Sequence, residues 1–318
     1  MKKRTIIALI VAVALIVVGG MILVLGLSFA GEGATQTGLT EQRVVITETF
    51  DSILIETGNC AVNFEPFNGS KDPYVDLRER EKTRHSVLVE DGVLKIKMTD
   101  NRRWMDYIGI FGMGWERMEM TVHLPQKQYE SLRITTDTGD IQIPEALVSK
   151  EILLRSSTGD IDCEGTAIDL LDCMTSTGDL FVRDGAPVLT KLQSSTGDLS
   201  VSGSMGKQIH MKTSTGEVNA ENVETQSFTC SSSTGEVELE RVLVEDYLQV
   251  FTTTGDVGIE DCDAGRVNIK TDTGDVNGHF LSPKWFDAHS DTGNVNVPST
   301  PEGGECRIQS DTGNIHFK

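Results

Sequence analysis

The chain has 318 residues, of which 38% are hydrophobic, so it carries enough apolar material to fold around a substantial core and is not expected to be disordered. Its 48 acidic residues outnumber 28 basic ones, and the formal net charge of −20 argues against nucleic acid or anionic lipid headgroups as partners. The six cysteines occur singly, without a CxxC pair or a histidine at zinc-ligand spacing, so they predict no metal centre and no cofactor.

Residues 1–30 form a membrane-targeting segment. Three basic residues at positions 2 to 4 precede an apolar run from about Thr5 to Leu27, which is long enough to cross a hydrocarbon layer of ~30 Å as a helix. Basic residues favour the cytoplasmic side, which predicts a single-pass anchor with all later residues extracytoplasmic. A cleaved signal peptide is the alternative, because Ser28 and Ala30 resemble a cleavage site, but the apolar run exceeds the usual length of about 7–15 residues. Residues 31–42 are predicted to be a flexible linker.

Residues 43–135 contain several strand-like runs of irregular length, such as RVVITETF and SVLVEDGVLKIKM. The tetrad ETGN at 56–59 is an isolated early corner between two of these runs. This region is therefore predicted to form irregular β coils or a cap.

A glycine-rich aromatic segment, NRRWMDYIGIFGMGWERM, interrupts this region. Aromatic and methionine side chains on a glycine-containing loop are typical of contact surfaces. The candidate interaction residues are Trp104, Tyr107, Ile108, Phe111, Met113 and Trp115. They are interpreted either as a plug that closes the N-terminal end of the fold, which is favoured, or as a surface for a protein partner or a membrane interface.

Residues 136–318 repeat one pattern with a regular period. The dipeptide TG followed by Asp, Glu or Asn places glycines at 139, 159, 178, 197, 216, 235, 255, 274, 293 and 313. The intervals are 19 or 20 residues, and such a period indicates a solenoid in which each coil buries its apolar face against its neighbours.

Aligning the coils on this glycine shows what each position does. The residue two places after it is always aliphatic, from Ile141 to Ile315, and the residue two further on is usually apolar, with Gly278 as the exception. This alternation indicates a β-strand, and apolar residues five places before the glycine indicate a second one. Glycine can turn the chain sharply between them, and the Ser or Thr three places before it could bond to this corner. The sequence therefore predicts an all-β, parallel β-solenoid (β-helix) of about ten coils.

An acidic residue follows the glycine in eight coils. These residues are Asp140, Asp160, Asp179, Asp198, Glu217, Glu236, Asp256 and Asp275, and Asn294 and Asn314 continue the series. The favoured interpretation is that the carboxylates accept hydrogen bonds from corner amides and stay solvated. The alternative is a ladder that binds divalent cations weakly, since Ca²⁺ takes oxygen ligands from flexible carboxylates.

The repeated tetrad around the corner glycine is interpreted as a structural element and not as a protease active site. Four coils read Asp-Thr-Gly, the aspartic protease signature, but Ser or Thr replaces that Asp in the other six without disturbing the period. No catalytic residue is predicted.

From about Phe50 the pattern resembles the bacterial "putative adhesin" family of β-solenoid type, a membrane-anchored domain of unknown function. The resemblance spans roughly residues 43–318 and rests on the run Asp91–Leu94, the strand end Val122–Pro125 and the serial TG[DEN] corners. It implies a non-catalytic cell-surface protein for adhesion, interaction or scaffolding, with a protein or cell-surface partner. Envelope-stress sensing or regulation is the alternative, and a polysaccharide-acting enzyme on a β-helix is less expected.

The last coil ends at Lys318 without a cap. Its apolar residues Ile308, Ile315 and Phe317 are expected to face an open end, because terminal coils present unpaired backbone groups. This predicts end-to-end self-association, or addition of a partner strand, through the C-terminal coil.

Overall fold

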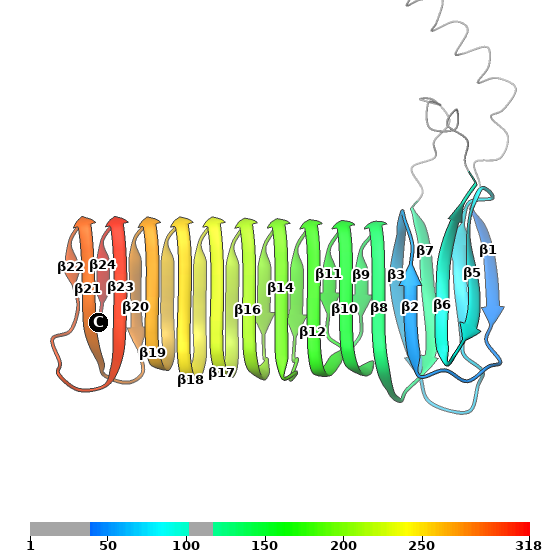
Figure 1. Ribbon diagram of the computed structural model, residues 1–318, viewed down its shortest axis with the longest axis horizontal. Helices are drawn as coiled ribbons and strands as arrows, with labels where there is room; N and C mark the ends of the chain where they lie inside the picture. Colours follow the sequence, from blue (N-terminus) through cyan, green and yellow to red (C-terminus); the bar gives the residue numbers. More distant parts are fainter. Residues whose placement is uncertain (1–38, 102–116) are drawn as a thin grey trace, which may run out of the picture.

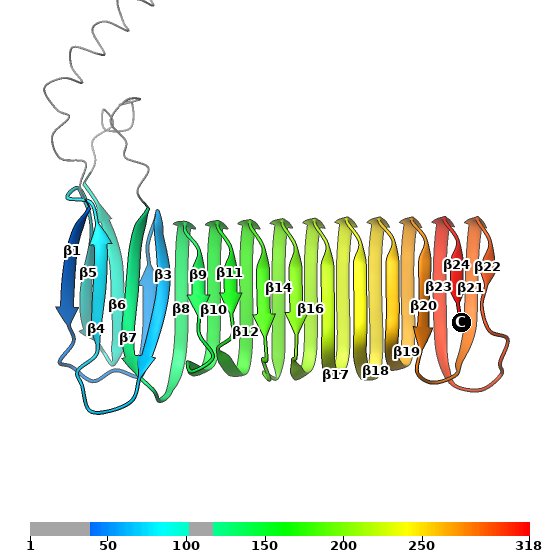
Figure 2. The ribbon, with the colours of Figure 1, turned by 180° about the vertical axis from the view of Figure 1, so that it is seen from behind.

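The computed structural model describes residues 39–101 and 117–318, which form a parallel β-solenoid of about nine turns with an irregular β cap at its N-terminal end (Figures 1 and 2). The ten corner glycines thus delimit about nine turns where about ten coils were predicted. All regular elements in these two ranges are strands. The described residues therefore include no helix that could cross a membrane. The predicted anchor at residues 1–30 and most of the linker lie outside the described residues.

Seven strands make an irregular cap at the N-terminal end (Figure 1). Strand β1 is antiparallel to β4, which is antiparallel to β7, and β5 and β6 form a hairpin whose turn residues Asp91 and Gly92 both have positive φ. Strands β2 and β3 instead run parallel to the solenoid strands that follow. The bounds are β1 Thr40–Val45, β2 Ser52–Glu56, β3 Cys60–Phe67, β4 Tyr74–Glu79, β5 Thr83–Glu90, β6 Val93–Asp100 and β7 Met118–Pro125.

The regular coils have a long strand before the corner glycine and a short strand after it. The long strands are β8 Gln128–Thr138, β10 Val148–Thr158, β12 Thr166–Thr177, β14 Leu189–Thr196 and β16 Met205–Thr215, and the short ones are β9 Ile141–Ile143, β11 Ile161–Cys163, β13 Leu180–Arg183, β15 Leu199–Ser202 and β20 Val276–Phe280. In the three coils between them, β17 Val218–Thr234, β18 Val237–Thr254 and β19 Val257–Thr273 run through without a break. Each residue lies opposite its equivalent one repeat away, as Leu154 does between Ile134 and Cys173.

The corner glycines stack directly on one another. Gly235 has a φ of 147°, and a Cβ on it would lie 2.0 Å from the carbonyl oxygen of Gly216 in the coil below. No other residue fits at such a position. The early corner at Gly58 begins this stack, because Thr138 donates its amide to the Gly58 carbonyl.

The hydroxyl three places before the glycine bonds to the corner in nine of the ten coils, as the sequence suggested, and Thr252 is the exception, with a buried hydroxyl that has no partner among the described residues. Each of the nine donates to the glycine carbonyl of the adjacent coil; Thr213 to Gly197 at 3.1 Å and Ser232 to Gly216 at 3.0 Å are examples. The other donors are Thr136, Ser156, Thr175, Ser194, Thr271, Ser290 and Ser310. These bonds satisfy carbonyls that would otherwise be left unpaired inside a tight turn.

A second corner lies six residues after the glycine, and the sequence analysis missed it. Four non-glycine residues there adopt the left-handed conformation with φ of 50–53°, namely Asp184, Asn222, Arg241 and Asp261, and Gly203 takes the same place with φ 60°. Asn, Asp and Gly tolerate this conformation best, so a periodic signal was present in the sequence.

The core is a continuous apolar column enclosed by the coils. All six cysteines are buried in the described structure and none forms a disulfide. Burial raises the pKa of Cys60, Cys163 and Cys306 to about 12, so these thiols are protonated at neutral pH and behave as small apolar side chains.

The expected position of the last coil at an open end is wrong. The final strands, β23 Gly304–Thr312 and β24 Ile315–Phe317, lie between the preceding coil and the coil of β21 Lys284–Thr292 and β22 Val295–Asn296. Figures 1 and 2 show β21 and β22 at the far end and the C-terminus one coil inside it. Ile308, Ile315 and Phe317 are therefore buried, with exposed fractions of 0%, 0% and 3%.

Gly278 explains how the last coil fits. The ring of Phe317 stacks on that of Phe280 with centroids 5.2 Å apart, and a Cβ on Gly278 would lie 2.8 Å from the Phe317 ring. The position that broke the apolar pattern is thus the space the final phenylalanine needs.

Candidate functional site

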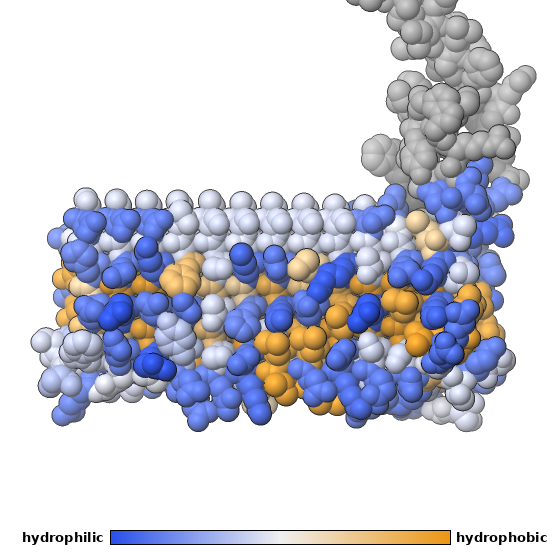
Figure 3. Space-filling view, in the orientation of Figure 1, coloured by the Kyte–Doolittle hydropathy of each residue, from blue (hydrophilic) through white to orange (hydrophobic). Residues whose placement is uncertain are grey.

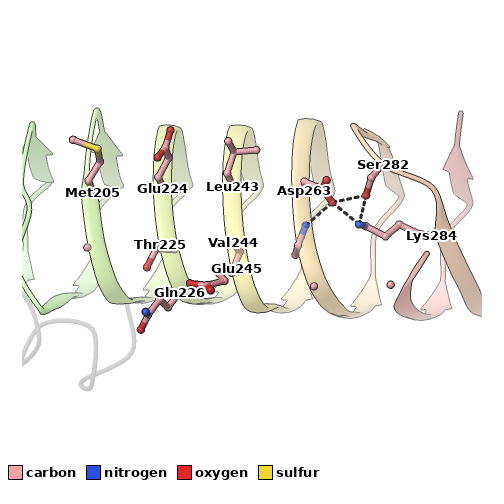
Figure 4. A pocket seen from close by; sticks show the side chains of 14 residues that line it. Met205, Glu224, Thr225, Gln226, Leu243, Val244, Glu245, Asp263, Ser282 and Lys284 are labelled. Carbon is pink, nitrogen blue, oxygen red and sulfur yellow. Dashed lines mark hydrogen bonds and ion pairs between the residues drawn. The ribbon is translucent and has the colours of Figure 1, made fainter. Parts of the chain in front are cut away.

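A groove crosses several coils near the C-terminal half of the solenoid (Figure 4). Its floor is formed by residues at equivalent positions of successive coils, namely Gly206, Thr225, Val244 and Ala264. The small residues in this series, with Gly265 and Gly304 beside them, leave a hollow of about 810 Å³.

The rim of the groove alternates apolar and acidic side chains. Met205, Glu224, Leu243 and Asp263 lie opposite one another in successive coils and form one row in Figure 4. Met205 is 60% exposed and Leu243 is 38% exposed. A second hollow of about 530 Å³ shares this rim and reaches Leu281, which is 56% exposed. Large exposed apolar side chains gathered around a groove mark a contact surface. Figure 3 shows that apolar patches lie among polar side chains on one face of the solenoid.

A buried lysine closes one end of the groove. The Lys284 side chain is 2% exposed, and its ammonium donates to the Asp263 carboxylate and, at 2.7 Å, to the Ser282 hydroxyl (Figure 4). Ser282 in turn donates to Asp263 at 2.9 Å. The lysine and the serine both donate hydrogen bonds to Asp263, so the three side chains hold one another in place at this end of the groove.

The ion pair sets the charge state of Asp263. Burial opposes ionisation of this carboxyl, but the hydrogen bonds from Lys284 and Ser282 and the charge of the lysine outweigh it and lower its pKa below the usual value. Asp263 therefore stays ionised at neutral pH and neutralises Lys284, so that Glu224 and Glu245 leave the groove acidic.

The acidic residues that follow the glycines form a straight ladder along the solenoid. In most coils the carboxylate accepts a hydrogen bond from the backbone amide of the next ladder residue, at 2.8 Å from Asp198 to Asp179 for example. Equivalent bonds join Asp160 to Asp140, Asp179 to Asp160, Glu217 to Asp198, Asp275 to Asp256, Asn314 to Asp275 and Asn294 to Asn314, over 2.7–3.1 Å. These contacts give most of the ladder side chains a structural partner and offset repulsion between neighbouring charges.

The cation ladder remains a prediction. Within residues 39–101 and 117–318, no group of three or more His, Cys, Asp or Glu side chains is arranged to hold a metal ion. The ladder does bring its carboxylates into one line, as the sequence period required.

Glu217 and Glu236 interrupt the ladder bonds. Their side chains are one methylene longer than aspartate, and neither accepts the amide of the next coil in the described ladder. We expect the double change Glu217→Asp and Glu236→Asp to add two bonds and stabilise the fold by about 1 kcal/mol. Thermal unfolding should show a Tm higher by about 2–4 °C. The reverse change, Asp179→Glu, should lower it, and a Tm that responds to neither change would contradict this role of the carboxylates.

A buried polar group in the cap could not be found from the sequence. The Thr57 hydroxyl lies 2.7 Å from Nε2 of His85, whose Nδ1 lies 3.0 Å from Oε2 of Glu79. The side chains of His85 and Glu79 are 0% and 2% exposed. The group connects β4 and β5 to the first corner. Because its side chains are buried, a substrate in solution could not reach it.

The candidate interaction residues from Trp104 to Trp115 lie outside the described residues. Both interpretations of them, plug and contact surface, remain predictions.

Comparisons with known proteins identify a family and give distant structural likenesses. The family model described as Toastrack DUF4097 matches residues 50–242 and 207–318. No curated protein matches the chain. Similar solved structures are a "putative adhesin" from Parabacteroides merdae (12% identity, TM-score 0.48, covering 76% of this chain and 96% of that one), a "putative adhesin" from Bacteroides fragilis (11%, 0.42, 89% and 98%) and a "putative lipid binding protein" from Parabacteroides distasonis (15%, 0.46, 88% and 97%).

Proposed function

This chain belongs to the Toastrack DUF4097 family, and we propose that it is a non-catalytic interaction module of the cell envelope, used for adhesion or scaffolding. The N-terminal apolar segment holds it to the membrane and leaves the solenoid on the extracytoplasmic side. The observation that carries the proposal is the groove whose rim exposes Met205 and Leu243 on a rigid stack of coils.

The chemistry of the described polar groups supports binding over catalysis. Buried thiols such as Cys163 have raised pKa values, Ser282 faces a carboxylate, and the ladder carboxylates accept backbone amides. Each of these groups is used to hold the fold together.

The charge of the groove suggests the chemistry of its partner. Glu224 and Glu245 give the groove a negative charge, because Asp263 and Lys284, which also line it, neutralise each other. A protein segment with both apolar and basic side chains complements this surface, because opposite charges speed association and reject acidic competitors.

The test compares two pairs of substitutions in the full chain. Met205→Ser with Leu243→Ser alters the groove rim, and Ile168→Ser with Val188→Ser is a matched control, since those two side chains are 37% and 45% exposed on other coils. Capture of envelope proteins followed by mass spectrometry should lose a salt-sensitive set of partners with the groove variant alone. An identical set of partners for wild type and both variants would contradict the proposal.

A further inference from the structure

The end of the solenoid opposite the cap exposes a coil of the same kind as the interior coils, with nothing covering it among the described residues. Among the described residues, β21 pairs with β23 alone and β22 with β24 alone, so the outer edges of both strands have no backbone partner. On β21, Phe286 and Ala288 are only partly buried, and on β22 Val295 is 42% exposed. The equivalent interior residue Ile308 is fully buried. An open edge with an apolar column beside it is a site for strand addition.

We propose that a second copy of this chain covers this end, so that β21 pairs antiparallel with β21 of the partner about a two-fold axis. The proposal goes beyond the function given above, because it uses neither the exposed rim of the groove nor the partner proposed for it. It commits to a homodimer whose two solenoids form one continuous rod.

The sequence of β21 complements itself when the two-fold axis lies at Ala288. With the axis at Ala288, Phe286 lies opposite Ser290, so that a large inward residue meets a small one. On the outer face Asp287 lies opposite His289, twice by symmetry. A shift of the axis to 287 places Asp287 opposite itself, and a shift to 289 places Asp287 opposite Asp291; directly opposed like charges destabilise a sheet.

The two ends of the molecule differ, which limits the assembly to two copies. The cap end presents β1 and β5, which pair antiparallel with their neighbours, so it offers no parallel coil that matches β21 and β22. A head-to-tail contact therefore lacks a complementary surface, and a two-fold contact closes on itself without forming fibres.

Cross-linking of the full chain in mild detergent tests the contact. Ala288→Cys places one thiol from each copy at the axis, within the Cα separation of about 4.5–5.5 Å for directly opposite residues. Mild oxidation should give a disulfide-linked dimer, while Val188→Cys, at a position 45% exposed on a side face, should stay monomeric. The native cysteines are buried and give little background. Absence of the dimer for Ala288→Cys, or equal cross-linking at position 188, would overturn the proposal.

A charge exchange tests the register. Asp287→Lys removes the carboxylate that lies opposite His289 and should shift sedimentation of the full chain toward the monomer, and adding His289→Glu, which makes an opposite-charge pair again, should restore the dimer. If the proportion of dimer is the same in both variants as in the wild type, the register is wrong and the proposal with it. So would cross-linking of the Ala288→Cys variant to a different protein in envelope membranes while the purified chain remains monomeric at high concentration.

Discussion

Gly235→Ala is expected to destabilise the solenoid by more than about 3 kcal/mol, because it adds a clash to a strained backbone conformation. The new Cβ would lie 2.0 Å from the Gly216 carbonyl oxygen, and the backbone φ of 147° is one that side-chain-bearing residues rarely adopt. The corner would have to move away from the coil below, which breaks stacking contacts on both sides. Urea unfolding followed by circular dichroism measures the loss.

Gly69→Ala is the matched control. Gly69 also has a positive φ, 119°, but nothing lies within 4 Å of the position its Cβ would take. We expect a loss of about 1–2 kcal/mol from backbone strain alone. Equal losses for the two substitutions would show that the close stacking of corners contributes nothing to stability.

Asp263→Ala is expected to cost about 3 kcal/mol, because it leaves the ammonium of Lys284 buried beside the groove without its carboxylate. Adding Lys284→Met should recover most of this loss, since the thioether side chain fills the same apolar space without a charge. Chemical denaturation of the single and double variants measures both effects. A single variant as stable as wild type would contradict the burial of the ion pair.

The same pair gives the wild type a pH dependence of known sign. The pKa of Asp263 is lower in the folded protein than in the unfolded chain, so the ion pair stabilises the fold above the unfolded value of about 3.9. This contribution disappears as the pH falls through the lower folded value. Asp263→Ala should lack that part of the acid transition.

The sequence was sufficient to predict the repeating corner, because the constraint acts at the same place in every coil. Glycine is needed wherever one corner carbonyl lies against the next, as at Gly216 and Gly235, and hydroxyls such as that of Ser232 bond at a fixed offset in all coils but one. A requirement repeated along the stack becomes a period in the sequence.

The order of the last two coils could not be predicted in the same way. Every coil carries the same apolar pattern, so periodicity does not tell whether the final coil lies inside or outside the one before it. The local clue was a pair of compensating residues, Gly278 and Phe317, which lie opposite each other in β20 and β24. A contact between coils that are not consecutive in sequence leaves no period.

The groove and the buried group in the cap were missed for a related reason. The hollow depends on small residues such as Gly206 and Ala264 that a search for apolar alternation passes over. Thr57, Glu79 and His85 come from separate parts of the cap, and only the fold brings them within hydrogen-bond distance. The acidic ladder was predicted with carboxylates that accept hydrogen bonds from corner amides, and most of its members make such a bond, as Asp179 does with the amide of Asp198.

Because the C-terminal coil is inserted between two others, the coil of β21 and β22 is the one at the open end. Amide hydrogen exchange of the full chain at low concentration tests this order of the coils most directly. We expect amides of β23 and β24, at residues 304–317, to be protected like those of the interior coils, because strands flank them on both sides. Amides of β21 and β22, at residues 284–296, should exchange fastest among the regular coils. Fast exchange at 304–317 together with protection at 284–296 would contradict the inserted coil and the open end inferred from it.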